Sequence, residues 1–315
     1  MTRPVTLSVA NLSKTFRVGF WRKKVEAVHR LNFEVYDGEI FGIVGPNGAG
    51  KTTTMKMLTG LIFPDEGTVE LFGESAAETS SRRRLGYLPE EPYFYDHLTV
   101  TELLHYYGSL HGVSGGEVDE RLDDLLNLVG LADVPHRPLR KFSKGMRQRA
   151  GIAQALVNDP ELVILDEPQS GLDPVGRKDV RDLIFRLREQ GKTVIFSSHI
   201  LVDVEAVCDR VAVMNEGELV EVADLDELAA SRDEIVEISV AGIDRSDVDD
   251  LEGLEHLEQS GKKWLLQFEG GIDVNPTLAQ LDDLGARILG VDRRRPHLED
   301  RFLQDTRPTE AQREG

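Results

Sequence analysis

Apolar positions along the chain form two patterns. Short apolar runs predict strands, and apolar residues at helical spacing predict helices. Short apolar runs typical of strands occupy residues 6–9, 31–35, 40–44, 68–72, 85–88, 162–165, 193–197 and 211–214. The runs at 162–165 and 193–196 are almost entirely apolar, as strands covered on both faces of a parallel sheet usually are. Because helical patterns separate these runs, we expect an α/β core up to about residue 222.

The stretch between residues 99 and 158 carries only helical patterns. It is interrupted at 112–116 and at 135–138, where Gly or Pro residues occur. This predicts a helical subdomain, over about residues 90–158, inserted between two strands. A further helical pattern, residues 53–61, follows the run 40–44.

The pattern changes after residue 222. It then reads as strand 234–240, helix 246–251, strands 254–258 and 263–269, helix 278–284 and strand 287–291. The order βαββαβ predicts a small ferredoxin-like or related α+β module over residues 223–305. Residues 306–315 are polar and are expected to form a flexible tail.

The segment GPNGAGKT, residues 45–52, has the spacing G-x-x-x-x-G-K-[ST] and lies between a predicted strand and a predicted helix. Backbone N–H groups of such a loop point into one concavity, the lysine reaches the outer phosphates, and the hydroxyl can ligate Mg²⁺. The alternative is a Gly-rich turn without a ligand, which the Lys-Thr pair and the strand-loop-helix context disfavour. We therefore expect nucleotide phosphates to be bound by Gly45, Pro46, Asn47, Gly48, Ala49, Gly50, Lys51, Thr52 and Thr53.

The segment LVILDEP, residues 162–168, places two carboxylates at the end of a predicted buried strand. An acidic pair at a strand end is often only solvated. Downstream of a phosphate loop in the same sheet, however, Asp166 is suited to hold Mg²⁺ through water and Glu167 to polarise an attacking water. The pair favours hydrolysis of the nucleotide over binding alone.

The net charge of −19 argues against nucleic acid as a partner, because nucleic-acid-binding proteins usually present a basic face. Two basic runs, 22–24 and 82–84, either face a partner or lipid headgroups or are solvated loops. Neither an apolar run of about 20 residues nor a leader sequence occurs, so we expect a cytoplasmic protein. Cys208 is the only cysteine, which excludes disulfides and multi-cysteine metal sites, and we expect it to pack on a helix.

Three further motifs accompany the loop and the acidic strand: FSKGMRQR at 142–149, SGLDP at 170–174 and SSHIL at 197–201. The set, in this order over residues 7–222, resembles the nucleotide-binding subunit of ATP-binding cassette (ABC) transporters. Small GTPases, adenylate kinases and recombinase-type ATPases share the loop but do not carry the other motifs together. The resemblance implies an α/β P-loop ATPase fold, the ABC cassette, in a domain over residues 1–222, with ATP and Mg²⁺ as its ligands.

The resemblance also implies roles for single residues. Ser143 and Gly145 match the signature loop, which covers the γ-phosphate of a nucleotide bound by the other subunit of a head-to-tail dimer. Asp173 matches the loop that crosses between the subunits. His199 matches the switch histidine, which contacts the γ-phosphate and helps Glu167 in catalysis. One chain would then supply half of each ATP site.

The chain departs from the family in the signature loop, in the metal loop and before SGLDP, where Gln169 replaces the familiar Thr. In the signature loop, usually L-S-G-G-Q, Lys144 and Met146 replace a Gly and the Gln. Glu90 stands where a Gln usually contacts Mg²⁺. A carboxylate can ligate the metal through water, so the expected metal ligands are Thr52, Glu90 and Asp166.

In this family an aromatic ring from the first strand stacks on adenine, and Phe16 stands at the matching place. Phe16 as an ordinary core residue is the alternative, and Trp21 is a rival for the stacking role. The aromatic position favours ATP over GTP.

Several features resemble the ABC-2 type branch, in which the ATPase subunit drives a separately encoded membrane exporter. They are the SKGMRQR motif, Glu90, the appended module and HLEDRFLQ at 297–304. The resemblance implies a transmembrane permease as partner, a homodimer or a heterodimer with a related ATPase, and a place on the cytoplasmic face of the plasma membrane. Residues 98–127 would dock the permease, and residues 89–95 would link it to the ATP site. The alternative is a soluble ABC-class ATPase acting on ribosomes or DNA.

Overall fold

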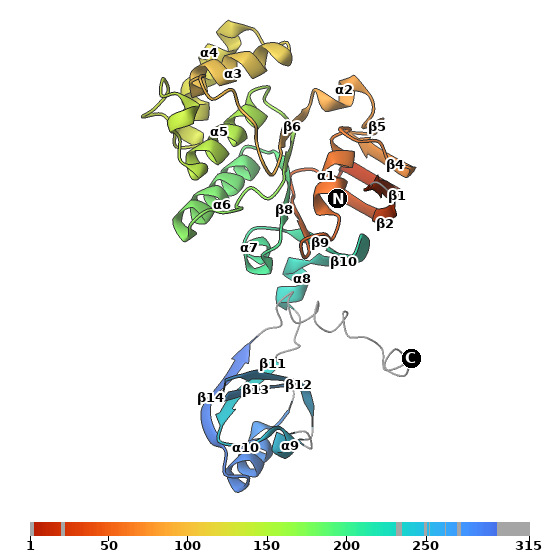
Figure 1. Ribbon diagram of the computed structural model, residues 1–315, viewed down its shortest axis with the longest axis vertical. Helices are drawn as coiled ribbons and strands as arrows, with labels where there is room; N and C mark the ends of the chain where they lie inside the picture. The colour runs from red at the N-terminus through yellow and green to blue at the C-terminus, as the bar shows by residue number, and fades with distance from the viewer. Residues whose placement is uncertain are drawn as a thin grey trace. The chain divides into compact units, whose positions relative to one another are not determined.

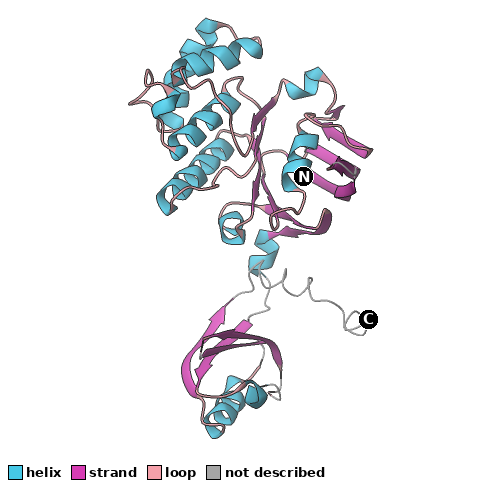
Figure 2. Cartoon of the chain, viewed as in Figure 1, coloured by secondary structure: helices cyan, strands magenta, loops and turns pink. Residues whose placement is uncertain are grey.

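The computed structural model describes residues 3–19, 23–230, 235–248, 251, 253–261, 263–269 and 272–294. The chain divides into two compact units, Met1–Leu225 and Asp226–Gly315. Figure 1 labels the elements of each unit, and Figure 2 colours them by type. Trp21, the segment 297–304 and the tail 306–315 lie outside the described residues. Within the described residues, no helix is long and apolar enough to cross a membrane.

The centre of the first unit is a six-stranded sheet in the order β10-β9-β3-β8-β7-β6. Its strands are β3 (Ile40–Val44), β6 (Leu85–Leu88), β7 (Leu162–Leu165), β8 (Thr193–Ser198), β9 (Arg210–Asn215) and β10 (Glu218–Asp224). Neighbouring strands are parallel except β10, which pairs antiparallel with β9. Every residue of β3, β7 and β8 is buried. The predicted parallel α/β core is confirmed, and β10 is an additional strand.

Helices cover one face of this sheet, and a helix with a second sheet covers the other. Figure 1 shows α5 (Lys144–Leu156) and α6 (Pro174–Glu189) on one side and α1 (Lys51–Leu58) on the other. The second sheet is antiparallel, in the order β2-β1-β4-β5, with β1 (Val5–Val18), β2 (Lys23–Tyr36), β4 (Glu66–Leu71) and β5 (Glu74–Ser75). One apolar core joins both sheets and α1, with Leu7, Leu31, Ile43, Met55 and Leu58 among its members.

Strands β1 and β2 are 14 residues each, much longer than the predicted runs 6–9 and 31–35. The first four residues of β2 are exposed, and buried positions alternate with exposed ones only toward its end. The apolar runs therefore miss the exposed start of β2, and they also miss Leu12 and Val28, which are buried singly outside the runs. The short helices α2 (Thr79–Arg82) and α7 (Leu201–Glu205) complete the first unit, together with the helical subdomain.

The helical subdomain lies between β6 and β7 in the chain. It contains α3 (Val100–Leu110), α4 (Gly115–Leu128), the 3-10 turn Leu139–Lys141 and α5. Thr99 and Ser114 start α3 and α4 with capping boxes, each paired with a glutamate three residues later. The helical insert was predicted correctly. The expected break at 112–116 is shorter, because Ser114 caps a helix that begins at Gly115.

The second unit contains β11 (Ile235–Ala241), α9 (Arg245–Val248), β12 (Leu254–Ser260), β13 (Lys263–Glu269), α10 (Val274–Asp283) and β14 (Arg287–Arg294). Helix α8 (Leu225–Ala230) spans the boundary between the units. The sheet of the second unit is antiparallel, in the order β12-β13-β11-β14. Its core brings Val236, Ile238, Leu266 and Phe268 of the sheet together with Val248 of α9 and Leu281 of α10. The predicted βαββαβ order is confirmed.

The close approach of α5 to β6 depends on a glycine. Gly86 is buried in β6, and a Cβ there would collide with the carbonyl oxygen of Ala155 and lie 2.9 Å from a ring carbon of Pro160. Strand β6 leads to the segment that carries Glu90, and α5 begins after Ser143. This contact therefore fixes two parts of the candidate site relative to each other.

We expect Gly86→Ala to lower the free energy of unfolding by about 1–3 kcal/mol, because α5 would have to move away from β6. Gly116→Ala is the matched control: a Cβ at this position in α4 meets nothing within 4 Å. It should leave the free energy unchanged or raise it by up to about 1 kcal/mol. Urea unfolding of the two variants checks the prediction, and equal stabilities would contradict it.

Candidate functional site

The loop after β3 is shaped by close contacts at its glycines. A Cβ on Gly45 would collide with the backbone of β9, and a Cβ on Gly50, whose φ is 96°, would collide with the carbonyl oxygen of Ala27. Both positions therefore require glycine. The tip of the loop, residues 46–48, is exposed, and α1 begins directly at Lys51. The first N–H groups of α1 are thus available to an anion in the loop.

The Lys51 side chain is buried under this loop and is only 6% exposed. Its Nζ donates to the carbonyl oxygens of Gly45 at 2.8 Å and Pro46 at 3.3 Å, and it lies 3.3 Å from Oε1 of Glu167. A desolvated ammonium attracts an anion more strongly than a solvated one does. The structure therefore brings Lys51 to the place expected of a phosphate-binding lysine.

The ends of β7 and β8 meet through the Ser197 hydroxyl. Its Oγ donates to Oδ1 of Asp166 at 2.8 Å and accepts the backbone N–H of Glu167, also at 2.8 Å. The Thr52 hydroxyl donates to the same oxygen of Asp166 at 3.3 Å. Three motifs that are distant in the sequence therefore converge on Asp166.

Asp166 is fully buried, and its second oxygen, Oδ2, has no hydrogen-bond partner among the described residues. Burial raises the pKa of this carboxyl, hydrogen bonds from Ser197 and Thr52 lower it, and the charges of Glu90 and Glu167 raise it. The structure thus brings Glu90 into the electrostatic reach of Asp166, although the Glu90 side chain itself is exposed. Several negative charges gather around one unpaired oxygen, and a divalent cation would relieve their repulsion.

The residues at this point fit a hydrated Mg²⁺ ion, which prefers oxygen ligands and keeps several of its waters. The Thr52 hydroxyl and the unpaired oxygen of Asp166 would hold it, with Glu90 acting through water. In the part of the chain that the structure describes, no group of three or more His, Cys, Asp or Glu side chains is arranged to hold a metal. The ion would therefore take its remaining ligands from water and from a bound phosphate.

Glu167 follows β7 with a φ of 48°, in the left-handed region that few non-glycine residues adopt. Its side chain is buried between Lys51 and His199, and its Oε2 lies 2.8 Å from Nδ1 of His199. The His199 side chain is 42% exposed. The strained turn places a buried carboxylate between a cation and a solvent-accessible imidazole, an arrangement suited to general base catalysis.

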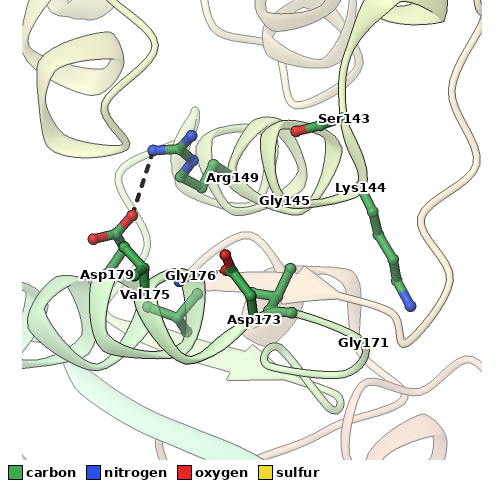
Figure 3. Close-up of a pocket in the computed structure, with 11 residues that line it drawn as sticks. Ser143, Lys144, Gly145, Arg149, Gly171, Asp173, Val175, Gly176 and Asp179 are labelled. Atoms are coloured by element: carbon green, nitrogen blue, oxygen red, sulfur yellow. Dashed lines mark hydrogen bonds and ion pairs between the residues drawn. The ribbon is translucent and has the colours of Figure 1, made fainter.

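Ser143, Gly145 and Asp173 come together in a different pocket, of about 350 Å³, between α5 and α6 (Figure 3). Ser143 caps α5 and Asp173 caps α6, each by accepting a backbone N–H. Lys144 extends over Gly171, so this lysine contacts the SGLDP loop. Among the described residues that line the pocket, none belongs to the phosphate loop. One chain therefore carries two separate groups of candidate residues.

Phe16 is half-buried on β1, opposite Val25 of β2. The Nζ of Lys14 lies 5.8 Å from the centroid of its ring. Phe16 is thus not one of the buried core residues. Stacking of this ring on adenine stays a prediction.

The SSHIL motif begins with Ser197, but sequence reasoning assigns no role in the site to Ser197 or to Tyr87. Ser197 is a polar residue at the end of an apolar run, and this is the signal that could have found it. The hydroxyl of Tyr87 is buried in β6 and has no hydrogen-bond partner within the described ranges. Burial, followed by the charges of Asp166 and Glu90, raises the pKa of Tyr87. Its place in an apolar strand gives no sequence signal.

The parallel sheet, the loop that holds Lys51 and the acidic end of β7 define a P-loop nucleotide hydrolase. Residues 28–170 match the family model described as ABC transporter. An ABC transporter ATP-binding protein of Synechocystis sp. is 44% identical over 299 residues, which cover 94% of this chain and 83% of the relative. The chain therefore belongs to the family of ABC transporter ATP-binding proteins and is an ATP-hydrolysing cassette.

Two further comparisons agree with this assignment. The bacitracin transport ATP-binding protein BcrA of Bacillus licheniformis is 38% identical over 287 residues, 84% of this chain and 93% of the relative. A dimeric, post-hydrolysis structure of the ATP-binding cassette MJ0796, bound to ADP and Pi, matches with a TM-score of 0.64 and 26% identity. That match covers 70% of this chain and 98% of the other. The family and the P-loop fold expected from the motifs are confirmed.

The buried charge of Asp166 leads to a test of stability. When burial raises the pKa of a carboxyl, the folded protein loses stability as the pH rises from the ordinary pKa to the raised one. We therefore expect Asp166→Asn, without nucleotide or Mg²⁺ at pH 7, to raise the melting temperature by about 2–4 °C, equivalent to about 1 kcal/mol. Calorimetry measures this difference, which should shrink toward pH 4, near the ordinary pKa of aspartate.

Asp123→Asn, at an exposed position in α4, is the matched control and should leave the melting temperature unchanged. A lower melting temperature for Asp166→Asn than for the wild type would show that the Asp166 carboxylate is not destabilising.

Proposed function

We propose that this chain is the ATPase subunit of an ABC-2 type exporter, and that ATP-driven dimerisation of two such subunits moves a separate membrane permease. The observation that carries the proposal is the cluster under the phosphate loop, where Lys51, Asp166 and Glu167 lie together and buried. The second pocket, with Ser143, supports a dimer. The subunit would then lie peripherally on the cytoplasmic face of the plasma membrane.

Glu167 is the group placed to polarise the attacking water. Its carboxylate oxygens lie 3.3 Å from Lys51 and 2.8 Å from His199. A γ-phosphate in the loop would compete with Glu167 for the ammonium of Lys51. The carboxylate would then keep only His199 as its partner and would become a better acceptor for the proton of a water molecule. ATP binding would thus prepare the base for hydrolysis.

Mg²⁺, when bound, neutralises negative charge on the β- and γ-phosphate oxygens. The hydroxyl of Thr52 and the unpaired oxygen of Asp166 supply its protein ligands in this proposal, and Ser197 holds the Asp166 carboxylate in place. Glu90 would take the place of the usual glutamine and act on the ion through water. The buried hydroxyl of Tyr87 lies close enough to these carboxylates for their charges to affect it.

The second pocket supports a head-to-tail dimer. Ser143 and the first N–H groups of α5, a helix of 13 residues, form a site for negative charge. This site does not share a pocket with the phosphate loop of its own chain, so it is suited to a γ-phosphate held by another subunit. Asp173, in the same pocket, would then lie at the boundary between subunits. The dimeric MJ0796 cassette supports this arrangement by analogy.

An aromatic patch supports docking of a permease. Tyr93 is 86% exposed, and the rings of Tyr95 and Tyr106 meet edge to face with their centroids 5.8 Å apart. Leu110, which is also exposed, extends the patch at the end of α3. Exposed apolar patches mark interaction surfaces, and this one joins α3 to the segment that carries Glu90. The bacitracin transport relative supports transport as the work of this chain.

Removal of the proposed base gives the first test. Glu167→Gln should still bind ATP, because the loop and Lys51 remain, but its turnover should fall at least about 100-fold. Because hydrolysis no longer opens the closed dimer of this variant, ATP should strengthen the self-association of Glu167→Gln more than that of the wild type. Sedimentation velocity measures the difference. Lys51→Ala is the control and should lose ATP affinity in calorimetry. Wild-type turnover by Glu167→Gln would contradict the role of Glu167.

Co-purification from gently solubilised native membranes gives the second test. The tagged chain should recover a multi-span membrane protein in about equal amount, identified by mass spectrometry. Tyr93→Ala/Tyr106→Ala should reduce this recovery, because the docking patch loses two of its exposed rings. Phe185→Ala, which removes an exposed ring from α6, is the matched control and should recover as much as the wild type.

Recovery of ribosomal or DNA-bound proteins, with nothing from the membrane, would show that the partner is soluble and is not a permease. A double variant that recovers the membrane protein in full would show that the aromatic patch is not the docking surface.

A further inference from the structure

Strand β14 forms one edge of the second unit's sheet and leaves apolar side chains at the surface. Ile288 is 37% exposed, Leu289 41% and Val291 45%, and Leu284 at the end of α10 is 41% exposed. Within the described chain, β14 pairs only with β11, so its outer edge is unpaired. Unpaired N–H and C=O groups beside apolar side chains form a template for another strand.

The register between β11 and β14 skips Leu289, which has no partner on β11. This bulge changes which side chains share a face. Ile288 and Val291 both lie on the face that α9 and α10 cover, whereas Arg287 and Asp292 both lie on the open face. In a regular strand, two residues separated by three or five positions would point to opposite faces.

We infer that β14 pairs antiparallel with β14 of a second copy of this chain, across a two-fold axis perpendicular to the sheet. Such an axis keeps each face of the sheet on its own side. The register that fits the bulge places Arg287 opposite Asp292 of the second copy, Ile288 opposite Val291, and Leu289 opposite Gly290. This register requires the bulge. Without the bulge, Arg287 and Asp292 would lie on opposite faces of the sheet, and so would Ile288 and Val291.

The charges of the strand select this register. Within one chain, Asp292 lies opposite Glu237 on β11, and like charges directly opposite each other destabilise a sheet. Arg287 of the second copy would stand on the other side of Asp292 and offset this repulsion, twice in each dimer. Shifting the second copy by two residues would place Arg287 opposite Arg294 or Gly290 and lose both ion pairs.

The side chains at the centre of the strand also fit. A Cβ at Gly290 would meet no atom within 4 Å, so Leu289 of the second copy finds room there. Ile288 and Val291 form a β-branched cross-strand pair that covers apolar surface on both chains. Bulges and charges often only blunt an edge strand. An edge strand that is only blunted, however, has no need of an arginine and an aspartate placed so that they face each other across a two-fold axis.

This inference takes from the proposed function only that two such chains act together. It adds that the second unit joins two identical copies, whether or not ATP is bound. The pairing therefore favours a homodimer over a heterodimer of related subunits.

Sedimentation velocity of the full chain, without nucleotide, tests the inference. The wild type should form a reversible dimer. Arg287→Asp and Asp292→Arg, each of which replaces two attractions by two repulsions, should raise the dissociation constant about tenfold. The charge-swapped double variant Arg287→Asp/Asp292→Arg should return it to within a few-fold of the wild type. Lys263→Glu, an equal charge reversal at an exposed end of β13, should have no effect.

A monomeric wild type would overturn the inference, and so would a double variant that associates as weakly as the single ones. Circular dichroism and ATP binding confirm that each variant is folded. The same substitutions in a Glu167→Gln background keep this outcome separate from the proposed function. In that background, ATP-dependent association of the cassettes should persist despite the β14 substitutions. If Glu167→Gln without those substitutions shows no ATP-dependent association, the result counts against the cassette dimer and not against the β14 pairing.

The register has its own test. The full chain with Ile288→Cys/Val291→Cys should form a disulfide-linked dimer on mild oxidation, because the two positions lie opposite each other in the proposed pair. The wild type, whose only cysteine is Cys208, is the control. Ile288→Cys alone should cross-link much less, because its counterpart on the second copy is not directly opposite. Equal cross-linking by the single and double variants would exclude this register.

Discussion

The Ser197 hydroxyl is the contact on which the chemistry of the first unit depends. It donates to Asp166 and accepts from the backbone N–H of Glu167, so one side chain at the end of β8 holds the Asp166 carboxylate and the Glu167 backbone at the end of β7. Strand β3 is the other neighbour of β8, and the loop after it brings Lys51 to the same edge. Because parallel strands end at the same edge, distant motifs become one site. The arrangement leaves a buried carboxylate with an unpaired oxygen and a left-handed backbone at Glu167.

Burial explains which elements the sequence could predict. The runs 40–44, 85–88 and 162–165 coincide with β3, β6 and β7 residue for residue, because these strands are buried almost from end to end. The long hairpin of β1 and β2 was predicted only in part, because the start of β2 is exposed and the buried Leu12 and Val28 stand outside the apolar runs. The start of α4 was missed for a local reason: the capping box of Ser114 outweighs the low helix propensity of the two glycines that follow it.

The candidate site also contains some residues that the sequence could predict and others that it could not. Residues within contiguous motifs, such as Lys51 and Glu167, could be named from spacing, because the motif itself carries the chemistry. The bridging role of Ser197 and the buried hydroxyl of Tyr87 could not, because they depend on how separate strands pack side by side. The position of Lys144 over the SGLDP loop depends on the packing of α5 beside α6. The bulge at Leu289 is likewise a property of strand pairing, and an apolar pattern alone does not reveal it.

A lasting contact through β14 changes the energetics of the ATP-driven step. Two separate subunits that close around ATP lose translational and rotational freedom, which costs about 4–15 kcal/mol. If the second units already hold the two chains together, most of that loss has occurred before ATP binds, and the cassettes meet at the high effective concentration of a tethered pair. More of the free energy of ATP binding would then be available for work on the proposed permease. Closing and opening of the cassettes thereby become a conformational change within one assembly, which can be repeated without separating the chains.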